Sequence, residues 1–259
     1  MVFGLFGSKR KKPESEWVGS PGKRLYAIGD VHGCFDEMIR LLDQIERDHQ
    51  SRPSKECIIV FLGDLIDRGP NSREVLDYLI KSPPNFARIF WLIGNHEEMF
   101  LRILRGESEL IESWMVYGGR ECVESYGLTS EQMIGQTDDA LQVMIRKRVP
   151  KSHIDFLARG VESIRFGDYL LVHAGVDPEK PVTDQDPRQM RWIREPFLSH
   201  DKPLGLMVVH GHTISDHVEV LPHRIGVDTG AYRGGALSAV RIEDNEVQPI
   251  SVRLTPVAA

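Results

Sequence analysis

Short apolar runs alternate with amphipathic stretches along the chain, and this alternation predicts an α/β fold. The segments 25–28, 57–62 and 88–93 are almost entirely apolar, as expected of strands that are buried on both faces of a sheet. Between the first two, apolar residues from 35 to 48 recur at helical spacing. A strand, a helix and a strand in this order form a βαβ unit, so these strands should run parallel and end at one edge of the sheet.

The pattern changes in the middle of the chain and returns to strands afterwards. From about 98 to 166 the apolar spacing is helical with little strand signal, which predicts a helical insertion over one side of the sheet edge. Further strands are expected at 169–172, 206–209, 224–228, 237–241 and 247–253. Residues 23–259 should therefore form one α/β domain that contains the helical insertion.

Composition is that of a globular protein and argues against several other classes. Hydrophobic residues make up 41% of the chain and charged residues 27%, and no apolar run is long enough to span a bilayer. The formal net charge of −6 argues against nucleic acid as a partner. Three widely spaced cysteines without a C-x-x-C pair predict neither disulfides nor a thiolate metal site. We therefore expect a cytoplasmic protein without stable membrane attachment; the sequence does not predict its oligomeric state.

The first 22 residues differ from the rest of the chain. Two phenylalanines and a leucine precede the basic run Lys9-Arg10-Lys11-Lys12, and prolines and glycines follow. A secretory signal carries its charge before its apolar segment, and the order here is the reverse. We expect residues 1–22 to be a disordered basic tail. Weak contact with anionic lipid is the alternative, because basic charge beside apolar side chains favours such surfaces.

Five expected strands end in polar residues of a restricted kind. These residues are Asp30 and His32, Asp64, Asn95 and His96, His173, and His210. One histidine at a strand end is more often a packed core residue, but five such ends at one edge favour a site. Carboxylate, imidazole and amide ligands without thiolate suit divalent ions such as Mn, Fe or Zn. Two ions that share a carboxylate lie ~3.5–4 Å apart and can activate one water molecule.

An imidazole beside this set predicts acid catalysis. If Asn95 faces a metal, His96 points elsewhere in the cleft, where it can protonate a leaving oxygen. Asp67 is the available carboxylate to fix its tautomer and to support its charged form. The neighbouring Arg68 can bind phosphate through two parallel hydrogen bonds.

Five motifs together resemble the signature of the phosphoprotein phosphatase family of calcineurin-like metallophosphoesterases. They are Gly29-Asp-x-His-Gly33, Gly63-Asp-x-x-Asp-Arg-Gly69, Gly94-Asn-His-Glu97, His173-Ala-Gly175 and His210-Gly-His212. Each motif alone is weak, whereas the ordered set is highly specific. The resemblance implies a two-sheet β-sandwich core flanked by helices, with a dinuclear metal centre at the strand ends.

The resemblance also implies a role for each matching residue. One metal, expected to be Mn with Fe, Zn, Co or Ni as alternatives, would be held by Asp30, His32 and Asp64. The second would be held by the shared Asp64 together with Asn95, His173 and His210. The resemblance makes His96 the general acid, paired with Asp67, and Arg68 a phosphate ligand.

Two assignments rest on weaker matches. Arg194, in the segment 192–195, resembles the second phosphate arginine of the bacterial and phage enzymes, and the nearby Arg191 is the alternative. His212 is expected to be structural or to support the ligands.

The family branch defines the reaction better than the substrate. Ile93 replaces the arginine that eukaryotic protein phosphatases usually carry, whereas the segments 118–127 and 226–231 look like the bacterial branch. We expect hydrolysis of phosphoserine and phosphothreonine in protein substrates, by attack of a hydroxide held between the two metals.

Two alternatives remain open. The first is a diadenosine tetraphosphate hydrolase that stacks a base on Trp114, Tyr117 or Tyr126. The second is an inactive scaffold that binds phosphoproteins.

Overall fold

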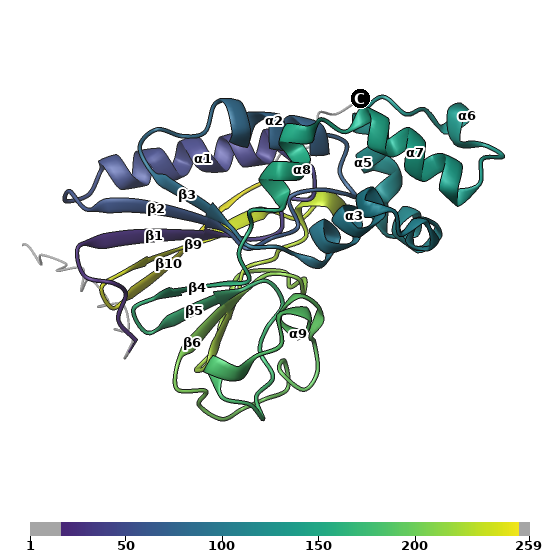
Figure 1. Ribbon diagram of the computed structural model, residues 1–259. Helices are drawn as coiled ribbons and strands as arrows, with labels where there is room; N and C mark the ends of the chain where they lie inside the picture. The colour runs from purple at the N-terminus through teal and green to yellow at the C-terminus, as the bar shows by residue number, and fades with distance from the viewer. Residues whose placement is uncertain (1–16, 254–259) are drawn as a thin grey trace, which may run out of the picture.

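The computed structural model describes residues 17–253, whose strands form two five-stranded sheets (Figure 1). The first sheet has the order β10-β9-β1-β2-β3, and the second has the order β4-β5-β6-β8-β7. The first contains β1 (Lys23–Ile28), β2 (Glu56–Phe61), β3 (Arg88–Trp91), β9 (Leu237–Glu243) and β10 (Glu246–Val252). The second contains β4 (Ser163–Phe166), β5 (Tyr169–Val172), β6 (Met207–His210), β7 (Glu219–Val220) and β8 (Arg224–Gly226).

Strand β1 is the central strand of the first sheet. It pairs in parallel with β2 and antiparallel with β9, and β3 continues the parallel set beyond β2. Helix α1 (Phe35–Gln50) connects β1 to β2, which is the βαβ unit that the sequence predicts. In the second sheet β5, β6 and β8 are also parallel. Each sheet therefore brings the carboxyl ends of its parallel strands to one edge.

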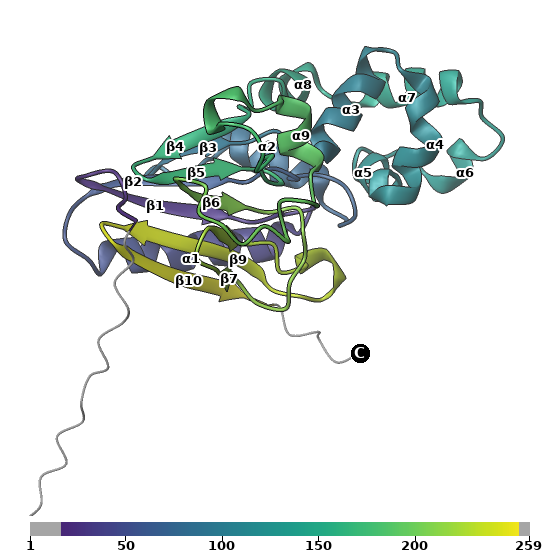
Figure 2. The same ribbon diagram turned by 90° about the horizontal axis from the view of Figure 1, so that it is seen from below.

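The two sheets pack face to face, as Figure 2 shows from below, and share an apolar core. Leu25 and Val60 from the first sheet meet Leu171 and Val209 from the second, and all four are fully buried. Helices α1 and α2 (Ser72–Lys81) cover the outer face of the first sheet, and α9 (Pro187–Trp192) packs on the second. The predicted α/β fold with a two-sheet sandwich core is confirmed.

The helical insertion projects beside the sheets at their carboxyl edge (Figure 1). It contains α3 (Asn95–Arg105), α4 (Ile111–Trp114), α5 (Arg120–Ser125), α6 (Ser130–Met133), α7 (Asp138–Arg148) and α8 (Lys151–Leu157). Residues 108–119 are irregularly helical, because a 3₁₀ turn (Ser108–Leu110), α4 and a π-type turn (Met115–Gly119) follow one another. The path kinks at Gly118, whose φ of 105° is open to glycine but strained for other residues.

Two further boundaries differ from the sequence prediction. The segment 163–166, expected to end the helical insertion, forms β4 and pairs antiparallel with β5. Residues 17–22 belong to the fold and not to a tail, because Trp17 packs against the inter-sheet core and Gly19 N–H donates to the Asp244 carbonyl (2.7 Å). The remainder of the expected tail, 1–16, lies outside the described residues.

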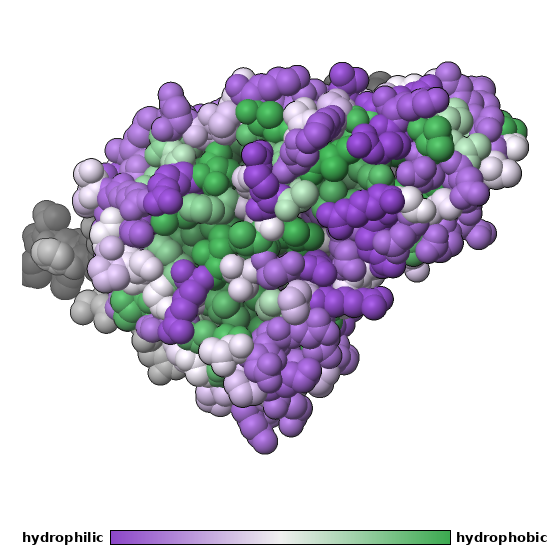
Figure 3. All heavy atoms as spheres, viewed as in Figure 1, coloured by the Kyte–Doolittle hydropathy of each residue, from purple (hydrophilic) through white to green (hydrophobic). Residues whose placement is uncertain are grey.

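One face of the molecule carries an apolar region. In the view of Figure 3, apolar side chains gather across the middle of the face, over β3 and α8, between polar margins. Within residues 17–253, no helix is both long and apolar enough to cross a membrane.

Candidate metal centre

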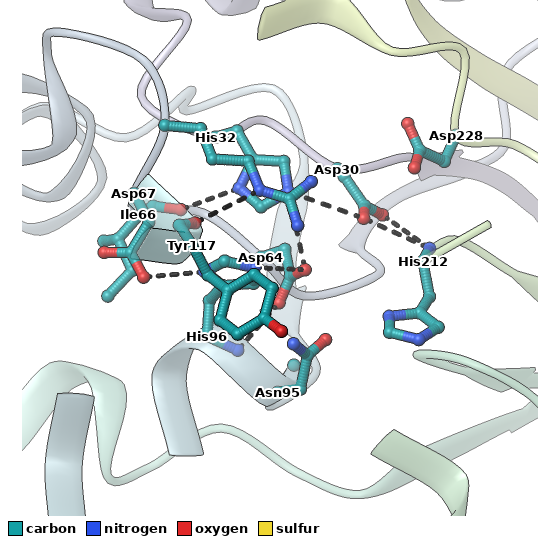
Figure 4. Close-up of polar contacts among 12 residues, drawn as sticks. Asp30, His32, Asp64, Ile66, Asp67, Asn95, His96, Tyr117, His212 and Asp228 are labelled. Atoms are coloured by element: carbon teal, nitrogen blue, oxygen red, sulfur yellow. Dashed lines mark hydrogen bonds and ion pairs between the residues drawn. The ribbon is translucent and has the colours of Figure 1, made fainter. Parts of the chain in front are cut away.

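The polar residues expected at the strand ends converge on the carboxyl edge with one exception, His210. Figure 4 shows five of them together: Asp30, His32, Asp64, Asn95 and His96. Asp30 and His32 follow β1, Asp64 follows β2, and Asn95 and His96 begin α3. The second sheet contributes His173 at the end of β5 and His212 just beyond β6.

The backbone at this edge is strained. Six non-glycine residues in the described part of the chain have positive φ, and five of them lie here: His32, Asp64, Asp67, Arg68 and His212. Each such conformation costs free energy and persists only where the surroundings impose it, as they do at functional sites. Strained residues concentrated at one edge are typical of a functional site.

Asp64 lies at the middle of the cluster. Its Oδ2 is 3.5 Å from His32 Nε2 and 3.5 Å from His173 Nε2. His32 Nε2 is also 3.9 Å from Asp30 Oδ2. Asp64 can therefore share its carboxylate between two neighbouring positions, as the sequence predicts for a bridging ligand.

Two imidazoles, those of His32 and His173, leave a lone pair on Nε2 beside Asp64, where a cation can bind. His32 Nδ1 lies 2.8 Å from the Ile66 carbonyl and His173 Nδ1 lies 2.7 Å from the Leu62 carbonyl. Because a carbonyl can only accept, both Nδ1 atoms carry protons. Burial lowers the pKa of His32 to about 3 and also lowers the pKa of His173, so both Nε2 atoms present lone pairs. His32 Nε2 has no hydrogen-bond partner, which fits a metal ligand.

A second contact gives the same indication. His173 Nε2 lies 2.9 Å from Asn95 Oδ1, although both atoms present lone pairs. A cation between them would turn this contact of two acceptors into coordination by both. The residues present thus fit the implied divalent ions.

His210 does not join the cluster, and His212 takes its place. One ligand atom from each of Asp64, His173 and His212 lies within 4.8 Å of the others. His210 instead packs edge-on against Phe197 (ring centroids 5.2 Å apart), and its Nε2 lies 3.3 Å from the Arg224 guanidinium. The expectation that His210 is a ligand and His212 structural is therefore corrected on geometry.

The alternation of side chains along β6 explains the correction. Val208 packs in the outer apolar cluster beneath α9, and His210, two residues on, faces the same way toward Phe197. Beyond the strand, the His212 N–H donates to the Asp30 carboxylate (3.0 Å), which turns the chain at Gly211 toward the site. Strand periodicity thus turns His210 away from the site. It does not predict the place of His212, which has the same parity and reaches the site because the chain leaves the strand at Gly211.

His96 and Asp67 form the expected pair. His96 Nδ1 lies 2.7 Å from Asp67 Oδ2, and both side chains are buried. Burial alone would lower the pKa of His96, but the carboxylates of Asp64 and Asp67 outweigh it and raise that pKa. The indole Nε1–H of Trp114, a fully buried residue, donates to the same Asp67 oxygen (2.7 Å). Trp114 thus positions Asp67, a role that the sequence did not predict.

Two acidic residues without a predicted role also belong to the site. Glu97 is fully buried and accepts the backbone N–H groups of Asp64, Leu65 and Gly94 at 2.8–2.9 Å. It fixes the loop after β2 to the start of α3. Asp228 follows β8 and lies beside Asp30 in Figure 4, and burial raises its pKa to about 6. Both residues stood inside sequence motifs, but nothing in the sequence showed what they contact.

The structure separates the two candidate phosphate arginines. Arg191 is held by Glu98 (Nε to Oε2, 2.8 Å) and Glu162 (Nη1 to Oε2, 2.5 Å). Arg194 lines a cavity of about 180 Å³ at the cluster, together with Arg68 and His96. The other lining residues are Asn95, Met99, Trp114, Tyr117, Trp192 and His212. Of Arg191 and Arg194, only Arg194 can therefore be reached by a phosphate in this cavity.

Comparison with known proteins identifies the family. The family model for calcineurin-like phosphoesterases matches residues 23–234. The chain belongs to this family. This metallophosphoesterase is 26% identical over 241 residues to the bis(5'-nucleosyl)-tetraphosphatase PrpE (asymmetrical) of Halalkalibacterium halodurans, across 87% of this chain and 93% of that protein.

Two solved structures resemble the metallophosphoesterase in fold. A candidate diadenosine tetraphosphatase has a TM-score of 0.60 at 19% identity, over 91% of this chain and 98% of that one. The cold-active protein-tyrosine phosphatase of a psychrophilic Shewanella species has a TM-score of 0.59 at 18% identity, over 95% and 87%. At these identities the likeness shows the fold alone.

Proposed function

We propose that this metallophosphoesterase hydrolyses a phosphoanhydride bond of bis(5'-nucleosyl) tetraphosphates. The observation that carries the proposal is the arrangement of Arg68 and Arg194 in the wall of one cavity at the metal-type cluster. Two guanidinium groups suit a chain of several phosphates, because each can bind phosphate oxygens through two hydrogen bonds. The PrpE relative, named for this activity and matched along most of its length, supports the same substrate class.

Two divalent ions would complete the site. Asp30, His32 and Asp64 would hold one, with the shared Asp64, Asn95, His173 and His212 holding the other, and Mn remains the metal that we propose. When bound, such ions supply positive charge to the phosphoryl oxygens and make water acidic enough to react near neutral pH.

The side chains around the cavity supply the remaining functions. Arg68 and Arg194 bind and orient the phosphates. His96 holds a proton for the departing oxygen, and Asp67 fixes that proton donor through Nδ1. The cost of losing His96 depends on the leaving group, because a departing nucleotide phosphate needs a proton far less than a departing alkoxide does.

The buried His96–Asp67 pair favours a second candidate, the protein phosphatase expected from the sequence. A serine or threonine alkoxide needs a strong proton donor, and the buried His96–Asp67 pair provides one. The relatives favour the nucleotide substrate, so the phosphoprotein activity stands as the second candidate.

A direct competition decides between them. Purified full-length protein is incubated with diadenosine tetraphosphate and a phosphoserine peptide at equal concentration, with Mn added or withheld, and the products are separated by chromatography. We expect Mn-dependent turnover with kcat/KM at least about tenfold higher for the dinucleotide. Preference for the peptide would restore the protein phosphatase. An inactive protein that holds no metal after Mn loading would instead indicate the phosphoprotein-binding scaffold.

A further inference from the structure

We infer that a pocket next to the cavity, between Tyr117 and Tyr232, is the subsite for one nucleoside of the substrate; this inference rests on the proposed function. The pocket has a volume of about 380 Å³, within the usual range of ligand pockets, about 300–1,000 Å³. Its lining residues are Arg68, Met115, Val116, Tyr117, Gly118, Arg120, Glu121 and Tyr232.

The pocket adjoins the phosphate-binding cavity. Arg68 and Tyr117 line both spaces. A substrate whose phosphates lie on Arg68 therefore has this pocket within immediate reach of its next group. For a dinucleoside polyphosphate, that group is a ribose that carries a base.

The pocket walls have the chemistry that a base requires. Among the three aromatic residues considered from the sequence, Trp114 and Tyr126 are buried, whereas Tyr117 is 59% exposed. An exposed aromatic face stacks on any base, and the exposed Arg120 beside it adds positive charge for a neighbouring phosphate.

The pocket is also preorganised around Arg68. The Arg68 guanidinium lies 4.7 Å from the centre of the Tyr232 ring, and its backbone N–H donates to the Gly118 carbonyl (2.9 Å). A Cβ on Gly118 would lie 2.5–2.8 Å from atoms of Arg68, so the chain approaches this closely only because residue 118 is glycine. The kink at Gly118 thus places Tyr117 beside the phosphate-binding arginine.

Charge argues against the pocket on the other side of the cavity. That pocket, of about 720 Å³, adjoins the cavity through Trp192 and Arg194. It contains four carboxylates, those of Asp177, Glu179, Asp186 and Glu195, against two arginines, Arg188 and Arg194. Acidic walls repel a polyphosphate chain, so we assign the base to the side of Tyr117.

The test compares substrates with and without a base. Steady-state kinetics are measured with Mn on diadenosine tetraphosphate and on inorganic tripolyphosphate, for the wild type, Tyr117→Ala, Tyr117→Phe and Trp192→Ala. Ile134→Ala, at a side chain that is 78% exposed and lines neither pocket, is the control. We expect Tyr117→Ala to raise KM for the dinucleotide about tenfold and to change KM for tripolyphosphate little. Tyr117→Phe keeps the ring and should therefore recover most of the affinity that Tyr117→Ala loses.

The possible results distinguish failure of the proposed function from failure of the nucleoside subsite. If the wild type does not hydrolyse diadenosine tetraphosphate, the proposed function fails whatever the variants do. If it does, an unchanged KM in Tyr117→Ala overturns the subsite, as does an equal rise for tripolyphosphate. A rise confined to Trp192→Ala would place the base in the acidic pocket and overturn the assignment as well.

Discussion

At the scale of single residues, the two histidines at the end of β6 have separable roles. His212 lies among the proposed ligands and His210 is packed under α9. We expect His212→Ala to lose about one of the two bound metals and most of its kcat, because a ligand is missing. His210→Ala should keep both metals and instead lower the melting temperature, because it leaves a cavity against Phe197. Metal analysis and thermal unfolding of the two variants check this; equal metal content in both would contradict it.

The role of His96 can be tested by measuring how the loss of kcat depends on the leaving group of the substrate. We expect His96→Asn to retain metal yet to lose orders of magnitude in kcat on an alkyl phosphate, which must depart with a proton. The loss on an aryl phosphate should be much smaller. Both rates are measured on the same preparation, with the wild type alongside. Equal losses on the two substrates would remove His96 from the role of acid.

At the scale of elements, Glu97 joins helix α3 to the loop after β2. Its two carboxylate oxygens accept three backbone N–H groups. In Glu97→Gln an amide NH₂ must face at least one of these donors. The variant should therefore be less stable by about 1–3 kcal/mol, with reduced metal affinity, because the loop holds Asp64. Denaturant unfolding measures the stability, and Glu112→Gln at an exposed glutamate is the control for a change of charge alone.

The sequence predicted elements where one physical rule dominates. Continuous apolar runs indicated β1, β2, β5 and β6, and the residues that follow them reach the site. The rule failed where the pattern is short. The four residues of β4 alternate polar and apolar side chains at the end of a helical region, and they form a strand because β5, which begins after two intervening residues, offers an antiparallel partner. The roles of Trp114 and Asp228 depend on folded contacts that no local pattern encodes.

At the scale of the whole molecule, the proposed ligands come from both sheets. Asp30 and Asp64 follow strands of the first sheet, whereas His173 and His212 follow strands of the second. Bound metal would therefore join the sheets and neutralise buried carboxylates. We expect a chelator to lower the melting temperature by several degrees, since a ligand at 100 times its Kd adds about 2.7 kcal/mol of stability. Adding Mn back should restore the original value, and an unchanged melting temperature would argue against a metal between the sheets.

The position of β1 between β2 and β9 has a consequence for folding of the chain during its synthesis on the ribosome. Its partner β2 is made soon after it, but β9 begins only at Leu237. At about 5–20 residues per second, one edge of the central strand waits about 10–40 s for its partner. An open strand edge invites pairing with other chains. The nascent chain is therefore most vulnerable to aggregation before its last strands emerge, and a message truncated before Leu237 would yield a chain with that edge permanently open.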